Sequence, residues 1–539
     1  MFRRAYQRAQ RWQADRQLAW QVGRVEAYLA QQAPALASGQ PVLVFNASTR
    51  IHMMSLNGAF SLLTAWGLRA RGVPVWHLVC QRGMEQCILG TDQRKPDRPP
   101  PCAPCIRFSQ LLFPPEHTIP LPLDETAATA AGVELAGLSL EELQVWSYRD
   151  YPLGELCLPG LRWALRRHHL ADDEPVRRLY RQYLRSASSL VQRIEPLLDD
   201  LEPQALVVFN GITYPEAVAR AVARRRQIPV VTHEVGLRPN SAFFSHDEAT
   251  FRQVELTDDD ELSPAQQAEL DAYLQARRAG RFSMAGIRFW PLVEGLPAEL
   301  DEAFERYDRA VTVFTNVIFD TSQVHANILF ADMFEWLDWL VPVVSANDRT
   351  LFVFRAHPDE DRPGKVSRES VSQWFASRLA QAPNVVLIAP HQFASSYELI
   401  ERSDLVLIYN SSVGLEAAIM EAPVLSAGRA RFTQAGTVFF PETRAAYQLK
   451  LAELLEVGQA PAEHAANARR FLYKELFEAS LDFSSFLRPY PDSPGMVLFD
   501  EFDPEALLGS TALDTIVQGI TEGMPFLLAW TEAGQAAPE

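Results

Sequence analysis

Short apolar runs alternate with segments of helical periodicity along most of the chain. From residue 41, an apolar run at 41–48 precedes a helical pattern at 56–72 and a second apolar run at 73–80. This order of strand, helix and strand predicts a βαβ unit and therefore a parallel sheet. Ligands of such sheets bind at the carboxyl ends of the strands.

The same pattern returns at 202–236, where a turn at Asn210-Gly211 lies between an apolar run and a helical segment. Asn46 and Asn210 follow corresponding predicted strands, and His233 follows the next one. Because the ends of parallel strands meet at one edge of a sheet, we expect Asn46, Asn210, Gly211 and His233 to face a common cleft. The basic segment 162–198 between the two units predicts one long helix.

A second series of alternating elements begins near residue 310 and continues to the apolar run at 423–425. We therefore expect an α/β protein with two Rossmann-like domains that face a cleft. The predicted parts are a helical segment at 1–40, a first domain at 41–290 with cysteine-containing and helical insertions, a second domain at 305–461, and a helical region at 462–539 that crosses back and ends in a frayed tail.

The composition, 47% hydrophobic and 22% charged with a net charge of −17, is that of a globular protein and argues against nucleic-acid binding. No apolar run approaches the roughly 20 residues of a membrane span, and the N-terminus lacks a signal core. We expect a cytoplasmic protein. The arginines of the first segment allow peripheral contact with an anionic membrane, and a solvated helix is the alternative; they are Arg3, Arg4, Arg8, Arg11 and Arg16.

Ser411 and Ser412 follow Asn410 where a predicted strand passes into a helix. Free amides and the positive end of the dipole make such a junction suitable for phosphate, and two hydroxyls add donors. Gly414 would allow close approach to the backbone. The alternative is a simple helix cap, which explains one serine only. Glu416, one turn further on, either binds ribose hydroxyls or is a solvated helix residue.

A second candidate group lies at the end of the run 350–355. Arg355 and His357 are able to donate to phosphate oxygens, His357 can stabilise a departing nucleotide, and Pro358 restricts the backbone between them and the loop that follows. The alternative is a charged surface loop. Because this group lies one βα unit before Ser411 and Ser412, it is favoured as part of the same ligand site.

Glu234 follows a strand of the first domain, so it would lie across the cleft from the serines. A carboxylate there can deprotonate an acceptor hydroxyl as a general base. The alternative is a structural ion pair with Arg238.

Four of the five cysteines fall in one short stretch, at Cys80, Cys87, Cys102 and Cys105. Four thiolates can hold a structural zinc ion or an iron–sulfur cluster, and reduced structural thiols are an equally good interpretation.

Together, "RAHPDE" and "YNSSVGLEAAIMEAPVLSAG" resemble the His-Pro and Ser-Ser motifs of GT-B glycosyltransferases, in the capsular polysaccharide and sialyl- or Kdo-transferase-like branch. The resemblance implies a C-terminal domain that binds a nucleotide-sugar through His357, Ser411 and Ser412, with Glu416 at the donor ribose. It also implies that Glu234 acts as the base on a glycan or lipid-linked acceptor. Many such enzymes carry a second glutamate where this chain has Ile408.

Transfer would then be a displacement at the anomeric carbon, without a divalent metal. No dinucleotide-binding or P-loop signature occurs in a suitable context, so NAD is not expected. The acidic run Asp258-Asp259-Asp260 is interpreted as solvent-exposed. Three alternatives stay open: a nucleotide-sugar 2-epimerase, a CDP-polyol phosphotransferase, and a non-catalytic scaffold of a polysaccharide pathway.

Overall fold

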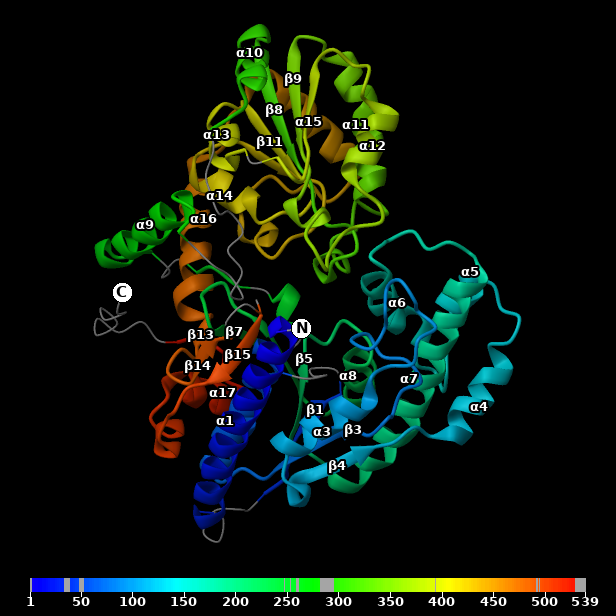
Figure 1. The fold of residues 1–539 in the computed structure, drawn as a ribbon. Coiled ribbons are helices and arrows are strands. Elements are labelled where there is room, and N and C mark those ends of the chain that lie inside the picture. Colours follow the sequence, from blue (N-terminus) through cyan, green and yellow to red (C-terminus); the bar gives the residue numbers. More distant parts are fainter. Residues whose placement is uncertain are drawn as a thin grey trace.

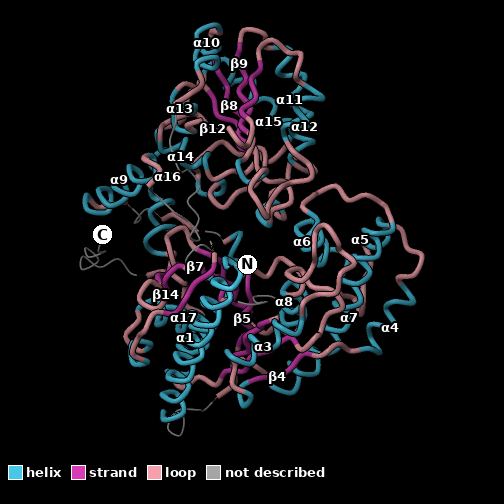
Figure 2. Tube along the Cα trace, in the orientation of Figure 1, coloured by secondary structure: helices cyan, strands magenta, loops and turns pink. Residues whose placement is uncertain are grey.

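The computed structural model describes residues 2–32, 39–47, 53–246, 248–252, 254–257, 261–281, 295–392, 394–490, 493 and 495–528. They form two α/β domains, one above the other in Figure 1. Figure 2 shows the strands of each domain gathered between helices. The expected run at 258–260 and the expected frayed tail from 531 lie outside the described residues.

The first domain is built on a seven-stranded sheet in the order β13-β7-β6-β5-β1-β3-β4. The five neighbouring strands from β6 to β4 run parallel, while β7 pairs antiparallel with both β6 and β13 at the other edge. The strands are β1 (Val42–Asn46), β3 (Val75–Cys80), β4 (Thr118–Leu121), β5 (Ala205–Phe209), β6 (Val230–Val235), β7 (Ser241–Ser245) and β13 (Leu481–Asp482).

Helices cover both faces of this sheet, because its strands carry apolar residues on both sides. One face packs against α1 (Phe2–Gln32), α2 (Leu56–Ala70) and α17 (Thr511–Glu522), and the other against α6 (Leu153–Leu165), α7 (Glu174–Leu201) and α8 (Glu216–Arg225). The shorter helices are α3 (Cys102–Leu112), α4 (Glu125–Glu134) and α5 (Leu140–Gln144).

The second domain has a five-stranded parallel sheet in the order β10-β9-β8-β11-β12. Its strands are β8 (Arg309–Phe314), β9 (Thr350–Arg355), β10 (Val385–Ile388), β11 (Leu405–Ile408) and β12 (Val424–Ser426). Its helices are α9 (Pro264–Arg278), α10 (Ala298–Arg306), α11 (Met333–Ala346), α12 (Val371–Arg378), α13 (Ser396–Glu401), α14 (Val413–Ile419), α15 (Arg444–Val457) and α16 (Ala462–Tyr473).

The parallel strands of both domains follow one rule of order. Numbered along the chain within each domain, they are arranged 3-2-1-4-5, which is the Rossmann order. The expected fold class, two Rossmann-like domains with additional helices, is therefore confirmed.

The chain passes between the domains twice, once after η3 (Ala249–Phe251) and once through the π-helical turn η7 (Lys474–Glu478). After η7, β13 pairs with β7 of the first sheet, and α17 packs on α2. A small antiparallel sheet joins β14 (Leu487–Pro489), β15 (Met496–Phe499) and β2 (Met54–Ser55).

A buried ion pair connects these two crossings. Arg252, at the first crossing, donates to Glu475 at the second, and Arg431 Nη1 lies 3.1 Å from the other oxygen of that carboxylate. Glu475 is 1% exposed and Arg252 is 7% exposed. The two crossings are therefore held against each other by a buried ion pair at the edge of the space between the domains.

Two predicted boundaries are wrong. The segment 162–198 is divided between α6 and α7, because Asp173 caps α7 with its side chain and Pro175 occupies its first turn. Helix α9 falls within the predicted first domain, but its Leu270 and Leu274 are buried in the core of the second.

The N-terminal segment is helical, as α1, and it packs along the first domain (Figure 1). The side chains of Arg3, Arg4, Arg8 and Arg11 lie outside the described residues. Arg16 is exposed and lies 4.7 Å from the ring of Trp12. No helix in the described part of the chain is long and apolar enough to cross a membrane.

Candidate active site

A cleft of about 930 Å³ lies between the two domains at the carboxyl ends of their parallel strands. Strand register explains why the two sets of loops meet there: Phe314, Arg355 and Ile408 end neighbouring strands at one level. Seven of the predicted residues line this cleft: Asn210, Glu234, His357, Asn410, Ser411, Ser412 and Glu416.

Glu234 enters the cleft from the end of β6 and is held by three donors. Its Oε2 accepts from Asn210 Nδ2 at 2.8 Å, and its Oε1 accepts from Asn57 Nδ2 at 3.3 Å and from its neighbour Val235 N at 2.9 Å. Burial raises the pKa of the Glu234 carboxyl above its ordinary value of 4.5, although the hydrogen bonds lower it. These contacts, rather than an ion pair with Arg238, fix its position.

Three residues predicted for this side of the cleft are structural. His233 is 1% exposed between the rings of Phe209 and Phe244, and burial lowers its pKa to about 3. Asn46 is also buried and accepts from Ser61 Oγ at 3.0 Å. Gly211 has a φ of 77°, and an added Cβ would lie 2.8 Å from Thr232, so the turn itself requires glycine.

The serine turn at the end of β11 does not cap its helix through a side chain. Ser412 is the N-cap of α14, but its hydroxyl makes no capping hydrogen bond. Ser411 is half-buried and Ser412 is exposed, and both face the cleft. Among the described residues, neither serine hydroxyl has a hydrogen-bond partner, so both are available to a ligand, and the interpretation as a simple cap is not supported.

Asn410 and Gly414 organise this turn from below. Asn410 accepts from Gln323 Nε2 and donates to Ser322 O, each at 2.9 Å, which ties the loop after β8 to the end of β11. A Cβ on Gly414 would lie 2.3 Å from Ile408 Cδ1. The small residue at 414 thus admits the side chain of Ile408, and Gly414 does not line the cleft.

Glu416 lies at the cleft surface with both oxygens engaged. Its Oε1 accepts from Arg277 Nη2 at 2.7 Å, and its Oε2 accepts from the hydroxyl of Tyr397. Arg277 comes from the last turn of α9, a helix 139 positions away in sequence. The carboxylate raises the pKa of Arg277 further above its ordinary value and therefore keeps the guanidinium charged.

The residues of the His-Pro motif have separate roles. His357 lines the cleft, and its Nδ1 accepts from Asp359 N at 3.1 Å, so the neutral ring carries its proton on Nε2. Burial lowers its pKa. Arg355 is 2% exposed and donates to Ala389 O at 2.9 Å, away from the cleft lining. Pro358 begins the short turn η5 (Pro358–Glu360).

Asp320 was not predicted, and it links the two sides of the cleft electrostatically. Its charge raises the pKa of Glu234 in the first domain and also that of His357 in the second, so it lies within electrostatic reach of both.

Besides Arg277, three cations line the cleft: Lys365, Arg429 and Arg431. They come from irregular loops without helical or strand periodicity, so no local pattern identifies them.

The four clustered cysteines are free thiols at the outer edge of the first domain. Cys80 ends β3 and accepts from Gly83 N at 3.3 Å, and Cys102 and Cys105 lie in the first turn of α3. Burial raises the pKa of Cys80 to about 11 and that of Cys87 to about 12. No three of these sulfur atoms lie within 4.8 Å of one another, so the metal site stays a prediction.

Residues 298–468 match the family model of the capsule polysaccharide biosynthesis proteins (Capsule_synth). This region contains the whole second sheet with the serine turn and the His-Pro motif. The second domain is therefore similar to the corresponding domain of that family. No protein of curated function matches the chain.

Among solved structures, the chain resembles the beta Kdo 2,4 transferase of Thermosulfurimonas dismutans KpsC at 12% identity, covering 50% of this chain and 79% of that one with a TM-score of 0.34. The beta Kdo 2,7 transferase of the same protein matches at 15% identity, over 59% and 87% of the two chains, with a TM-score of 0.32. UDP-GlcNAc 2-epimerase of Neisseria meningitidis, bound to UDP-GlcNAc, matches at 12% identity, over 80% and 98%, with a TM-score of 0.25.

Proposed function

We propose that the protein is a glycosyltransferase of the GT-B type that transfers a sugar from a nucleotide-sugar to a hydroxyl acceptor in capsular or related polysaccharide synthesis. The observation that carries this proposal is the composition of the cleft. Glu234, an oriented carboxylate of raised pKa, enters from one domain, and unengaged serine hydroxyls with His357 enter from the other. The family match of residues 298–468 supports the pathway.

The donor would bind to the second domain. Ser411 and Ser412 offer hydroxyl donors to the phosphates, His357 offers Nε2–H, and Lys365 and Arg429 add positive charge to the same cleft. Glu416 is neutralised by Arg277, so it would accept from ribose hydroxyls without repelling the phosphates as an unpaired carboxylate would.

The acceptor would bind to the first domain. Aromatic and apolar side chains accompany Glu234 there, including Trp163, Phe209 and Phe243, which suit the flat apolar faces of sugar rings. The hydrogen bonds from Asn210 and Asn57 hold the Glu234 carboxylate in one direction. A fixed base has the geometry that general-base catalysis needs.

In the proposed reaction, Glu234 removes the proton of an acceptor hydroxyl as its oxygen attacks the anomeric carbon. The bond from that carbon to the nucleotide phosphate breaks, and the phosphate leaves with the bonding electrons. His357 and the serine hydroxyls stabilise the negative charge on the leaving oxygen by hydrogen bonds. Every step uses residues of this cleft, and no metal ion is required by the proposal.

A thermal-shift screen of CMP-, UDP-, GDP- and CDP-linked sugars tests the donor site. We expect stabilisation by one nucleotide class, weakened about tenfold in affinity by His357→Ala and by the double change Ser411→Ala with Ser412→Ala, because each removes phosphate donors. Ser377→Ala, on α12 and away from the cleft lining, is the matched control.

The outcomes separate the competing functions. A folded protein stabilised by no nucleotide would contradict the transferase and the epimerase alike and would favour a scaffold. Conversion of the nucleotide-sugar without an acceptor would identify an epimerase. A product that retains the phosphate would identify a phosphotransferase.

A further inference from the structure

The loop between α6 and α7 reaches across to the second domain beside the cleft. Arg166 Nη2 donates to Gly364 O at 3.0 Å, and Arg368 N donates to Arg166 O at 2.9 Å. The backbone amides of His168 and His169 both donate to Glu369 Oε2, at 2.6 and 3.1 Å. Two adjacent histidines of the first domain are therefore fixed on the surface of the second.

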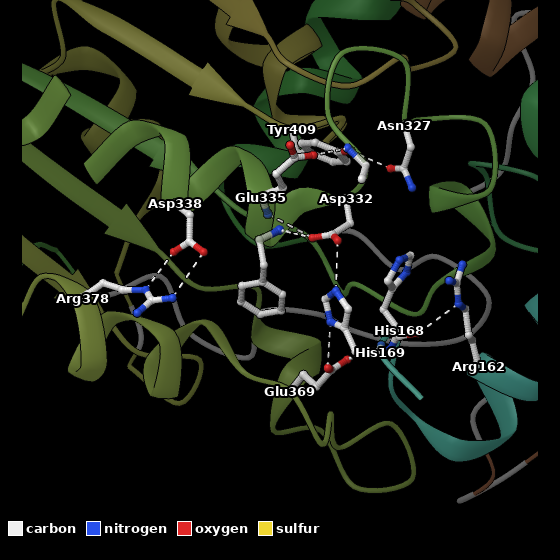
Figure 3. A network of polar contacts seen from close by, with 12 residues as sticks. Arg162, His168, His169, Asn327, Asp332, Glu335, Asp338, Glu369, Arg378 and Tyr409 are labelled. Atoms are coloured by element: carbon white, nitrogen blue, oxygen red, sulfur yellow. Dashed lines mark hydrogen bonds and ion pairs between the residues drawn. The ribbon is translucent and has the colours of Figure 1, made fainter. Parts of the chain in front are cut away.

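Asp332, the N-cap residue of α11, lies close to both histidine side chains, and His169 contacts it directly (Figure 3). One potential ligand atom from each of His168, His169 and Asp332 lies within 4.8 Å of the other two. Within the described ranges, this is the one such group of histidine, cysteine or acidic side chains. Neither histidine nor Asp332 lines the proposed active-site cleft.

Each member is oriented by a second contact. His169 Nδ1 lies 2.9 Å from Glu369 Oε1, which leaves its Nε2 directed at Asp332 Oδ2, 3.0 Å away. The other oxygen of Asp332 accepts from Phe334 N at 2.7 Å and Glu335 N at 3.1 Å. Metal-binding histidines commonly have this arrangement, in which one ring nitrogen contacts a carboxylate and the other is directed at the metal.

His168 supplies a second, independent observation. Its side chain is only 8% exposed, and in the described part of the chain neither ring nitrogen has a hydrogen-bond partner, since its hydrogen bonds are all made by the backbone. A ring nitrogen without a hydrogen-bond partner has a lone pair available for a metal.

We propose that His168, His169 and Asp332 form a zinc site that joins the two domains beside the active-site cleft. Two imidazoles and one carboxylate are a ligand set that zinc accepts, with a fourth position left for water. His169 has a side chain that is 55% exposed, which gives the ion a path from solvent. Glu369 would act behind His169 and would not itself bind the ion.

Without zinc, His169 and Asp332 contact each other directly, with 3.0 Å between His169 Nε2 and Asp332 Oδ2. Zinc would bind between these two atoms, which makes the proposal testable by direct binding.

The experiment is a titration of chelator-treated full-length protein with ZnCl2, followed by calorimetry and by thermal shift. We expect one zinc ion whose affinity falls at least about tenfold in His168→Ala and in Asp332→Asn. The exposed His391→Ala is the matched control and is expected to bind as the wild type does. His168→Gln, of similar volume, serves if the alanine variant does not fold.

The cysteine cluster provides the opposing control. Binding that persists in His168→Ala but disappears in Cys102→Ser with Cys105→Ser would place the ion at the thiols and overturn the proposal. Absence of any zinc binding to the wild type would also overturn it. In the cobalt-substituted protein, we expect absorption bands typical of tetrahedral cobalt, and these bands should persist in the cysteine variant. The bands report on the histidine ligands and do not depend on transferase activity.

Discussion

Arg277 Nη2 lies 2.7 Å from Glu416 Oε1, so a helix that precedes the second sheet in sequence completes the proposed donor side of the cleft. The Arg277 side chain is 20% exposed and Glu416 is 8% exposed, and removal of either partner would leave an uncompensated charge.

Arg277→Met is expected to weaken nucleotide binding about tenfold, because the unpaired Glu416 would repel the donor phosphates. The double variant with Glu416→Gln should recover part of the loss. Dissociation constants of the four proteins in a double-mutant cycle measure this coupling. Equal affinities across the cycle would show that the pair has no part in donor binding.

Glu234→Gln should lower kcat by about 10²–10⁴, because an amide cannot accept the acceptor's proton, and should leave the nucleotide dissociation constant unchanged. Initial rates with saturating donor measure the first quantity and calorimetry the second. Glu453→Gln, an exposed glutamate on α15, is the control. A variant of wild-type rate would assign the base to another group.

The pH dependence of kcat/KM reports on the same carboxylate. The proposed general base Glu234 would act in its deprotonated form, and burial raises its pKa, so activity should rise with pH through a midpoint above the ordinary value of 4.5. Asn210→Ala removes a hydrogen bond that favours the carboxylate, which should move this midpoint further up. A midpoint that is lower in the variant would contradict this assignment.

Glu360 provides a test of stability. Its carboxyl is 1% exposed, and burial raises its pKa from 4.5 to about 8, so the folded state retains a proton that the unfolded chain releases. The free energy of unfolding should therefore fall as pH rises from the unfolded to the folded pKa. Glu360→Gln should remove this loss, with a gain of about 3 kcal/mol near neutral pH relative to acid pH.

Urea unfolding of the wild type and of Glu360→Gln at several pH values measures this difference. The exposed Glu305→Gln serves as control and should follow the wild type. Parallel curves for wild type and Glu360→Gln would show that the raised pKa is not realised.

The cysteine cluster leads to a separate prediction. If the four thiols hold zinc or iron, purified protein with the double change Cys102→Ser and Cys105→Ser should lack the metal bound by this cluster. Its thermal stability should also be lower than that of the wild type. Elemental analysis of the variant and of Cys157→Ser, whose buried thiol lies outside the cluster, decides this. If the wild-type cluster contains no metal, the four cysteines are best interpreted as reduced structural thiols.

The sequence predicts the strands well, because apolar runs that end in polar residues mark both the strand and the edge where ligands bind. Glu234, His357 and the serine turn were found this way, and they line one cleft. Gly414 and Arg355 also have suitable positions in the sequence, but the pattern does not show their contacts. Gly414 lies against the side chain of Ile408, and Arg355 donates to the carbonyl of Ala389.

Contacts between distant segments were beyond the sequence pattern. Arg277 belongs to a helix whose periodicity shows only that it has a buried face, and the pattern does not reveal which domain it covers. The division between α6 and α7 was marked by Asp173 and Pro175, yet the helical periodicity on both sides obscured it. That division releases the loop that carries His168 and His169.

The two crossings between the domains also determine how the cleft can move. A single connection would allow one domain to swivel freely, whereas two adjacent connections define an axis. Arg252 and Glu475 hold the connections together, so we expect rotation about that axis to open and shut the cleft more readily than twisting across it. The double connection would then act as a hinge between the proposed donor and acceptor surfaces.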